Sequence, residues 1–241
     1  MEETDKLTNT FSEEGRIHQV EYAIKGVHNA GPAIGVLFRN GVFLLGKNTD
    51  DAVSLVQDEK IYVINSRTAA VVGGLYADSN LLVNYVRVKA QDYLRKYSQE
   101  MPAHLIAKTI CKIKQKFTQG GGMRPFGVSF IIAGCDDDKR WKMYVTNPSG
   151  TMTEWRACLF GEGEKNISAV LDTLPENCEM EDAIVLAFRA LSATSEGALK
   201  NTQSITGMLM YTREESKRHV MKEMSQREIQ RYLELAKNRE R

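Results

Sequence analysis

The glycine-rich stretch TQGGGMRPFG, at residues 118–127, is the part of the sequence that most suggests a ligand held by backbone amides. A phosphate-binding loop also needs a Lys-Ser/Thr pair and free amides at the start of a helix. The stretch lacks that pair, and Pro125 removes an amide donor. We therefore expect a turn between a helix and a strand.

Metal chemistry is the second possibility, because Asp136, Asp137 and Asp138 are adjacent carboxylates. A calcium loop also carries a later glycine and a glutamate, which are missing here at that spacing, so we expect a solvated hairpin tip. The histidines and cysteines do not have metal-ligand spacing either. We predict no metal and no cofactor, and free, mostly buried thiols in a reducing compartment, namely Cys111, Cys135, Cys158 and Cys178.

The segment from Arg213 to Arg241 is rich in both basic and acidic residues. Its apolar seam is narrow, and consists of Ile229, Tyr232, Leu233 and Ala236. We interpret it as a solvated surface helix with intrahelical ion pairs rather than as a nucleic-acid-binding helix. Ser225 with Glu228 three residues later is a capping box, which places the last helix at 225–240.

Composition narrows the class of protein. The 32 basic and 31 acidic residues give a net charge of +1, which argues against a nucleic-acid partner. No apolar run approaches the roughly 20 residues of a membrane span. With 241 residues, 42% of them apolar, and no internal repeat or linker, the chain is expected to form a single domain over 1–241.

The spacing of apolar residues predicts the elements that position these groups. Strands are expected at 33–38, 42–47, 60–65, 68–74, 127–134, 141–146, 151–160 and 204–211, the first two joined by an Asn-Gly hairpin turn. Helices are expected at 19–29, 78–97, from Pro102 to the glycine run, 162–174, 179–196 and 225–240. Two hairpin-rich strand sets with amphipathic helices between them indicate an α+β sandwich, with its core at 33–211.

By residue type alone, the segment FSEEGRIHQVEYA at 11–23 is an ordinary lead-in to the first helix. As a string it resembles the N-terminal signature of proteasome α subunits, through Phe11, Ser12, Gly15, Arg16, Gln19, Val20, Glu21, Tyr22 and Ala23. Further matches follow in the family's order at Glu59-Lys60-Ile61, Gly74-Leu75-x-Ala77-Asp78, Arg124–Val128 and Pro148-Ser149-Gly150. The resemblance covers nearly the whole chain and is nearest to the α4-type class (α3 in yeast order).

The resemblance implies the N-terminal-nucleophile hydrolase fold, a four-layer αββα sandwich of two antiparallel sheets. In catalytic members of that fold a threonine at the start of the first strand attacks the substrate, and an acidic residue and a lysine tune it. In this sequence those three positions align with about Gly31, about Lys47 and Lys60. We therefore predict no catalytic residue and no enzyme activity in the chain itself.

The resemblance also implies two binding functions. Lys60 would capture the C-terminal carboxylate of an activator in a pocket walled by Gly74 and Leu75, the alternative being a structural lysine at a strand edge. Residues 1–12 would form a gate over a pore, followed by a ring-contact helix at 19–29. The gate residues Asp5 and Tyr22 match the family, whereas Thr4 and Glu13 replace its tyrosine and proline.

The predicted function is that of a non-catalytic α-ring subunit of the 20S proteasome core, supporting ring assembly, substrate gating and activator docking for ubiquitin-dependent and other protein degradation. The resemblance implies neighbouring α subunits, β-ring subunits and the ATPase regulatory particle or other activators as partners, and a cytoplasmic and nuclear location. Two alternatives remain open. They are a self-processing threonine hydrolase of the same fold and a free-standing assembly or binding protein.

Overall fold

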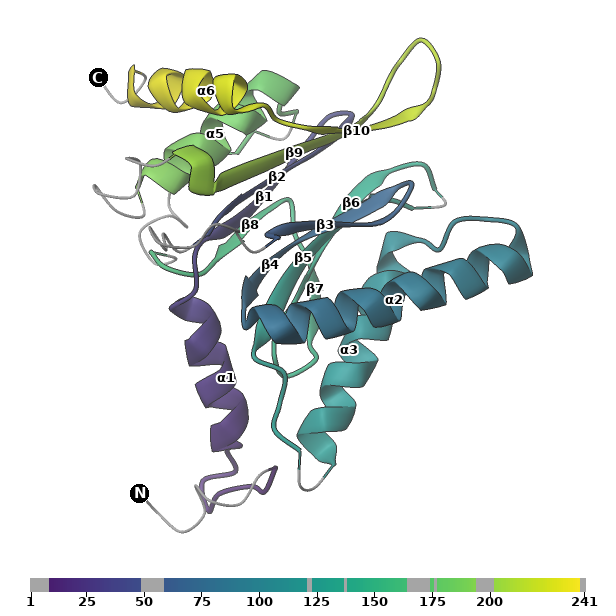
Figure 1. The fold of residues 1–241 in the computed structure, drawn as a ribbon, viewed down its shortest axis with the longest axis vertical. Coiled ribbons are helices and arrows are strands. Elements are labelled where there is room, and N and C mark those ends of the chain that lie inside the picture. The colour runs from purple at the N-terminus through teal and green to yellow at the C-terminus, as the bar shows by residue number, and fades with distance from the viewer. Residues whose placement is uncertain are drawn as a thin grey trace.

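The structure is a computed structural model of the chain. It describes residues 9–48, 59–120, 123–136, 138–163, 174–175, 177–193 and 202–238. The ten strands in this part of the chain form two five-stranded antiparallel sheets, and helices lie around them (Figure 1). The predicted helix at 162–174 falls mostly outside the described residues.

The first sheet has the strand order β10-β9-β2-β1-β8. Its strands are β1 (Ala33–Phe38), β2 (Gly41–Lys47), β8 (Ala157–Phe160), β9 (Ile205–Thr212) and β10 (His219–Glu223). The second sheet has the order β3-β4-β5-β6-β7. Its strands are β3 (Ile61–Asn65), β4 (Thr68–Gly74), β5 (Val128–Cys135), β6 (Trp141–Thr146) and β7 (Met152–Glu154).

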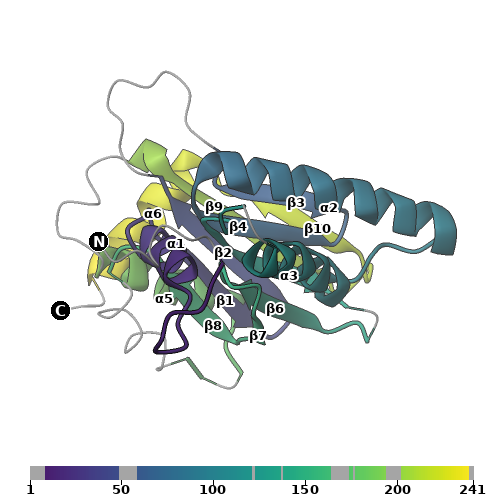
Figure 2. The same ribbon diagram turned by 90° about the horizontal axis from the view of Figure 1, so that it is seen from below.

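Helices cover the outer face of each sheet, which confirms the predicted four-layer α+β sandwich. The helices α5 (Met180–Ser192) and α6 (Gln226–Asn238) pack on the first sheet, and α2 (Tyr76–Tyr97) and α3 (Ala103–Gln119) pack on the second. A fifth described α-helix, α1 (His18–His28), projects from one end of the sandwich, and Figure 2 views it almost along its axis. A short 3-10 helix at Thr202–Ser204 precedes β9. Among the described helices, none combines the length and apolar character that crossing a bilayer requires.

The period of two along each strand builds three apolar layers. In β2, Phe43 and Leu45 face α5 and α6, whereas Val42 and Leu44 face the other sheet. Side chains of β5 divide in the same way between the α2–α3 layer and the space between the sheets. The central strands of each sheet are therefore buried on both faces, which explains why they are apolar almost throughout, whereas the edge strands β7 and β10 are partly exposed and more polar.

The predicted single strand at 151–160 is wrong, because the chain changes sheets within it. β7 pairs with β6 of the second sheet, and β8 pairs with β1 of the first. At the crossing, the Trp155 amide donates to the Met143 carbonyl at 3.1 Å, and the Leu37 amide donates to the Arg156 carbonyl at 2.8 Å. The segment contains no glycine or proline that would reveal this break locally.

The prediction of a solvated helix from Arg213 onward also needs correction. Residues 219–223 form strand β10, which pairs with β9 at the edge of the first sheet. The capping box is present, because the Glu228 carboxylate accepts a hydrogen bond from the Ser225 amide at 2.9 Å. The helix that follows is not merely a surface element, since Ile229 and Leu233 of its seam are buried in the same apolar cluster as the side chains of α5.

The hairpin between β5 and β6 differs from its prediction as well. Asp136 is buried, and its carboxylate accepts a hydrogen bond from the Tyr144 hydroxyl at 2.8 Å. Asp138 is exposed, as expected of a hairpin tip, and Asp137 lies outside the described residues. The four cysteines are free and buried.

Candidate functional site

The candidate site lies where α1 runs into β1. Lys60, directly before β3, extends its side chain to this point, and its Nζ donates to the Gly31 carbonyl at 2.9 Å. The Lys47 amide at the end of β2 donates to the Pro32 carbonyl at 3.0 Å. The structure thus brings together the three positions that the sequence alignment had assigned to the nucleophile, the acidic residue and the lysine.

Two glycines make room for this arrangement. A Cβ at Gly46 would lie 2.5 Å from the Lys60 Cγ, so a larger residue would displace the lysine stem. A Cβ at Gly73 would lie 2.6 Å from the Phe160 ring and 3.8 Å from the Gly31 carbonyl oxygen. The end of β4 therefore lies beside Gly31, and Lys60 is 8% exposed beneath it.

Chemically, this arrangement favours binding rather than nucleophilic attack. Gly31 has no side chain that could attack a carbonyl, and Lys47, at about the position that the family resemblance assigns to the acidic residue, carries the opposite charge. What remains is the Lys60 ammonium held against a backbone carbonyl. An ammonium in a largely buried position can form a charge-assisted hydrogen bond with a carboxylate.

Gly74 and Leu75 follow at the end of β4. Gly74 has φ +121°, and a Cβ there would lie 2.1 Å from the Gly127 carbonyl oxygen. The Leu75 amide donates to that same carbonyl at 2.9 Å, while the Leu75 side chain is 53% exposed. The glycine is thus required by close contact with the neighbouring backbone, and Leu75 is the residue that presents an apolar surface.

Two segments that match the family, Gly74–Asp78 and Arg124–Val128, contact each other just after Leu75. The Asp78 carboxylate accepts two hydrogen bonds from the Arg124 guanidinium, at 2.7 and 2.8 Å, and one from the Gly127 amide at 2.8 Å. Burial by itself would raise the pKa of Asp78, but the hydrogen bonds from Arg124 and Gly127 outweigh it and lower that pKa. We call this arrangement the Asp78 clamp, and it holds the start of α2 against the loop that precedes β5.

The N-terminal signature forms a tight turn before α1. The Gly15 amide donates to the Ser12 carbonyl at 2.9 Å, the Arg16 amide donates to Ser12 Oγ at 3.1 Å, and Gly15 has φ +75°. Arg16 then donates to the Glu21 carboxylate from Nε at 2.8 Å. The hydrogen bond from Arg16 lowers the pKa of Glu21. The polar signature residues thus shape the chain where the helix begins.

The apolar signature residues divide between the core and the surface. Val20 is buried, whereas Phe11 is 72% and Tyr22 50% exposed. Exposed aromatic side chains of this size, Phe11 in the turn before α1 and Tyr22 within α1, favour contact with another chain. The predicted gate residue Asp5 lies outside the described residues.

Asn9 is a residue that the sequence reasoning missed. Its Nδ2 donates to the Phe117 carbonyl at 3.0 Å and the Met123 carbonyl at 2.9 Å, and it also contacts the Gly120 carbonyl. Asn9 has φ 67°, a conformation that asparagine tolerates better than most residues. It therefore fastens the N-terminal segment to the end of α3, a contact for which no local sequence pattern exists.

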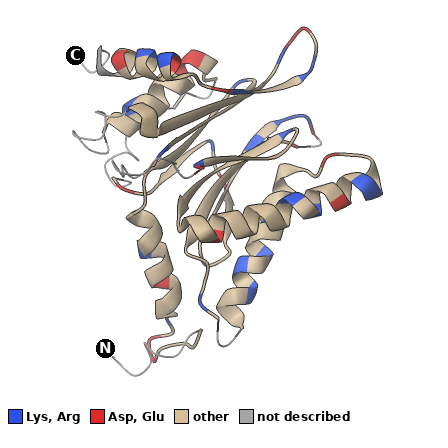
Figure 3. Ribbon diagram, viewed as in Figure 1, with Lys and Arg blue, Asp and Glu red and all other residues tan. Residues whose placement is uncertain are grey.

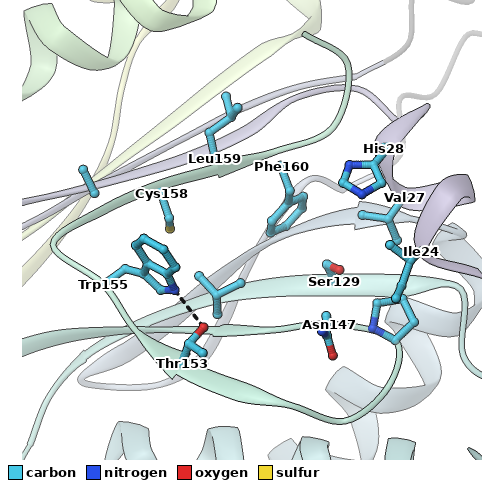
Figure 4. Close-up of a pocket in the computed structure, with 13 residues that line it drawn as sticks. Ile24, Val27, His28, Ser129, Asn147, Thr153, Trp155, Cys158, Leu159 and Phe160 are labelled. Carbon is cyan, nitrogen blue, oxygen red and sulfur yellow. Dashed lines mark hydrogen bonds between the residues drawn. The ribbon is translucent and has the colours of Figure 1, made fainter. Parts of the chain in front are cut away.

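A mainly apolar cavity of about 360 Å³ lies between α1 and the β7–β8 crossing (Figure 4). Ile24 and Val27 of α1 line one side of it, Trp155 lines the opposite side, and Phe160 lies between them. Burial raises the pKa of the Cys158 thiol in its wall, so this sulfur is not a thiolate near neutral pH. The cavity can therefore accept an apolar side chain but does not supply a cysteine nucleophile.

Comparison with known proteins agrees with these features. The family model for proteasome subunits matches residues 27–207, and the model for the N-terminal signature of the A-type proteasome subunits matches residues 5–25. The chain is 39% identical over 198 residues to the alpha type-3 proteasome subunit of Saccharomyces cerevisiae, covering 80% of this chain and 77% of that protein.

Two plant relatives are similar over comparable lengths. The alpha type-4 proteasome subunit of Spinacia oleracea is 38% identical and the alpha type-4-A proteasome subunit of Arabidopsis thaliana is 36% identical, each over 205 residues. In both cases the match covers 83% of this chain and 82% of the relative. The type-3 name in yeast and the type-4 names in plants agree with the class that the motifs indicated.

Proposed function

The chain belongs to the proteasome α-subunit family, and from this premise we propose that it is a non-catalytic member of the core α ring that supports ring assembly, substrate gating and activator docking. The observation that carries the proposal is Gly31, a residue without a nucleophilic side chain, at the point where Lys60 reaches the start of β1. The four-layer sandwich is the arrangement expected of the N-terminal-nucleophile hydrolase fold.

The exposed part of α1 supports the assembly role. Tyr22 of α1 and Phe11 of the turn before it are largely exposed, as residues that contact a neighbouring subunit would be, and Asn9 fastens the chain that precedes them to the end of α3. We propose neighbouring α subunits and β-ring subunits as the assembly partners. The cytoplasmic and nuclear location and the role in ubiquitin-dependent degradation belong to the same proposal.

The purified chain is expected to show no peptidase activity of its own, because position 31 provides no attacking atom. The measurement is hydrolysis of fluorogenic peptides together with labelling by a threonine-directed covalent inhibitor. A catalytic β subunit of the same particle serves as the positive control. Inhibitor covalently attached to this chain, or a mature N-terminus near residue 31, would favour the self-processing hydrolase instead.

The docking role centres on Lys60, which we propose contacts the C-terminal carboxylate of an activator tail beside Gly74 and Leu75. Lys60→Met keeps an unbranched stem against Gly46 and removes the charge. Loss of a charge-assisted hydrogen bond of about 1.5–3 kcal/mol is expected to weaken docking at this pocket roughly ten- to a hundredfold. Added salt is expected to reduce the difference.

The measurement is cross-linking from an activator tail to this subunit within the assembled ring, where other pockets do not contribute to the signal. Lys89→Met, which removes an exposed lysine from α2, is the matched control and should cross-link like the unaltered ring. Undiminished cross-linking in the Lys60→Met ring would mean that Lys60 only supports the local structure.

A further inference from the structure

A second cavity lies at the opposite end of the sandwich from α1. The turns β1–β2, β3–β4, β5–β6 and β9–β10 all reach this end (Figure 1). Between them is a cavity of about 850 Å³, lined by residues of both sheets. Nothing in the proposed function uses this end of the molecule.

The lining of this cavity is strongly basic. It contains Arg39, Arg67, Lys139, Arg140 and Lys217 against one carboxylate, Glu214, although the whole chain has 32 basic and 31 acidic residues. Figure 3 shows Lys and Arg on the turns at this end. Charges of one sign in a cleft concentrate the electrostatic field and attract a ligand of the opposite sign.

Some of this charge is compensated and some is not. Arg39 lies 3.6 Å from a Glu179 oxygen, and Arg140 lies 2.8 Å from an Asp138 oxygen. The carboxylate of Glu214 accepts a hydrogen bond from the Asn40 side chain at 2.7 Å. For Arg67, Lys139 and Lys217, the described residues supply no carboxylate within ion-pair distance.

The two lysines occupy unusual backbone positions. Lys139 has φ 60° and Lys217 has φ 53°, and each lies at the tip of a hairpin that borders the cavity. Glycine or asparagine adopts this conformation with less strain than lysine does. The turns alone therefore do not account for a long cationic residue at both tips.

The inner part of the cavity is held by a network that joins the two sheets. The Trp141 indole Nε1 donates to Thr212 Oγ1 at 2.9 Å, and this oxygen lies 3.2 Å from His219 Nδ1. The pKa of His219 is lowered, first by burial and second by the positive charge of Arg67. Hydrogen bonds between the two sheets therefore fix the inner wall of the cavity, and the positive charge of Arg67 acts on that wall.

We propose that this cavity binds a compact polyanion that carries several phosphate groups. Its volume lies within the usual range of small-ligand sites. The cations come from four turns placed around one space instead of following a line, which suits a compact ligand better than an extended acidic peptide. Guanidinium and ammonium groups are the side chains that bind phosphate oxygens most strongly.

The test is calorimetric titration of the full-length chain with inorganic tripolyphosphate at low and at physiological ionic strength. The unaltered chain is expected to bind with defined stoichiometry, and more weakly at the higher salt concentration. The double variant Lys139→Asn, Lys217→Asn removes two cations and inserts a residue that suits positive φ. Its affinity should fall about tenfold or more.

A matched control removes the same charge elsewhere. Lys108→Gln with Lys112→Gln alters two exposed lysines of α3 and is expected to leave the affinity unchanged. Arg67→Gln, on a different turn, should weaken binding in the same direction as the double variant, which keeps the test informative if either protein folds poorly. ATP is expected to bind at the same site, and equal affinities for ATP and tripolyphosphate would identify the phosphate chain as the recognised group.

Three results would overturn the proposal. The first is that neither tripolyphosphate nor ATP binds saturably. The second is that the α3 control loses as much affinity as the Lys139→Asn, Lys217→Asn variant. The third is that a glutamate-rich peptide binds whereas tripolyphosphate does not. Because this cavity and Lys60 lie at opposite ends of the sandwich, none of these results bears on the docking role of Lys60.

Discussion

Replacing Gly74 by alanine is expected to lower the free energy of unfolding by about 3–5 kcal/mol, since it combines backbone strain with steric overlap. The φ of +121° at this position is one that residues with a side chain rarely adopt. The added Cβ would also lie 2.1 Å from the Gly127 carbonyl oxygen and 2.9 Å from the Val128 Cα. Both neighbours are backbone atoms, so no side chain can rotate away to relieve the contact.

Displacement of the Gly127 backbone by the added Cβ would also weaken the hydrogen bonds that Gly127 makes. The Gly127 carbonyl accepts from the Leu75 amide, and the Gly127 amide donates to Asp78 in the Asp78 clamp. Chemical denaturation of the full chain measures the loss directly. A Gly74→Ala protein as stable as the unaltered chain would mean that this turn relaxes easily.

Gly26→Ala is the matched control, because it makes the same chemical change in a different setting. Gly26 lies within α1, and a Cβ there would meet nothing within 4 Å. Alanine is favoured over glycine inside a helix by about 1 kcal/mol. This variant is therefore expected to be more stable than the unaltered chain, by up to about 1 kcal/mol, so the two alanine substitutions should change the free energy of unfolding in opposite directions.

Replacing Lys114 by methionine is expected to destabilise the fold by about 2–4 kcal/mol, because buried acceptors would lose their donor. Lys114 is completely buried on α3, and its Nζ donates to the Val128 carbonyl at 2.8 Å and to Thr146 Oγ1 at 2.9 Å. The ammonium also lies 4.8 Å from the centre of the Phe130 ring. Methionine fills a similar volume but cannot donate a hydrogen bond to either oxygen.

The contribution of Lys114 is also expected to depend on pH. Burial lowers the pKa of this lysine to about 7, whereas a lysine in the unfolded chain keeps its ordinary value near 10.4. Between these values the unfolded state binds a proton that the folded state does not, so the stability of the unaltered chain rises with pH. The Lys114→Met variant lacks this effect.

The difference in unfolding free energy between the two proteins should therefore increase between pH 7 and pH 9, by on the order of 1 kcal/mol per pH unit. Titrating groups that Lys114 does not influence are common to both proteins and cancel in the difference, and Cys111, whose pKa the charge of Lys114 lowers against the effect of burial, is replaced by alanine in both. Urea denaturation across this pH range is the measurement. A difference that stays constant or falls with rising pH would show that Lys114 remains charged in the folded state.

Local patterns determined most of the secondary structure of this protein. The Asn40-Gly41 step predicted the first hairpin, and short continuous apolar runs predicted the strands on either side of it and most of those that follow. The period of 3.6 predicted α2 and α3, and the glycine run ended α3 where the structure ends it. These features depend on neighbouring residues, so the sequence contains the information needed to predict them. The string at 11–23 indicated the family for a different reason, its similarity to a known signature.

Packing decided which faces are buried. Leu105, Ile113 and Phe117 recur at helical spacing along α3 and would be expected to face the core together, but they are only partly buried. The fully buried side instead contains Ala107, and it ends with Lys114. A lysine becomes acceptable in the core only because Val128 and Thr146, on two different strands, offer oxygen acceptors there.

Tertiary structure alone determined the two sites and the change of sheet at Trp155. Local spacing fixes the direction of a side chain relative to its own element, but not which distant element it meets. Asp78 meets Arg124, Lys60 meets Gly31, and the basic turns surround one cavity because the order of strands in the two sheets brings their ends together. The free energy of these contacts comes from pairs far apart in the chain, and it depends on the position of each element in the assembled sandwich.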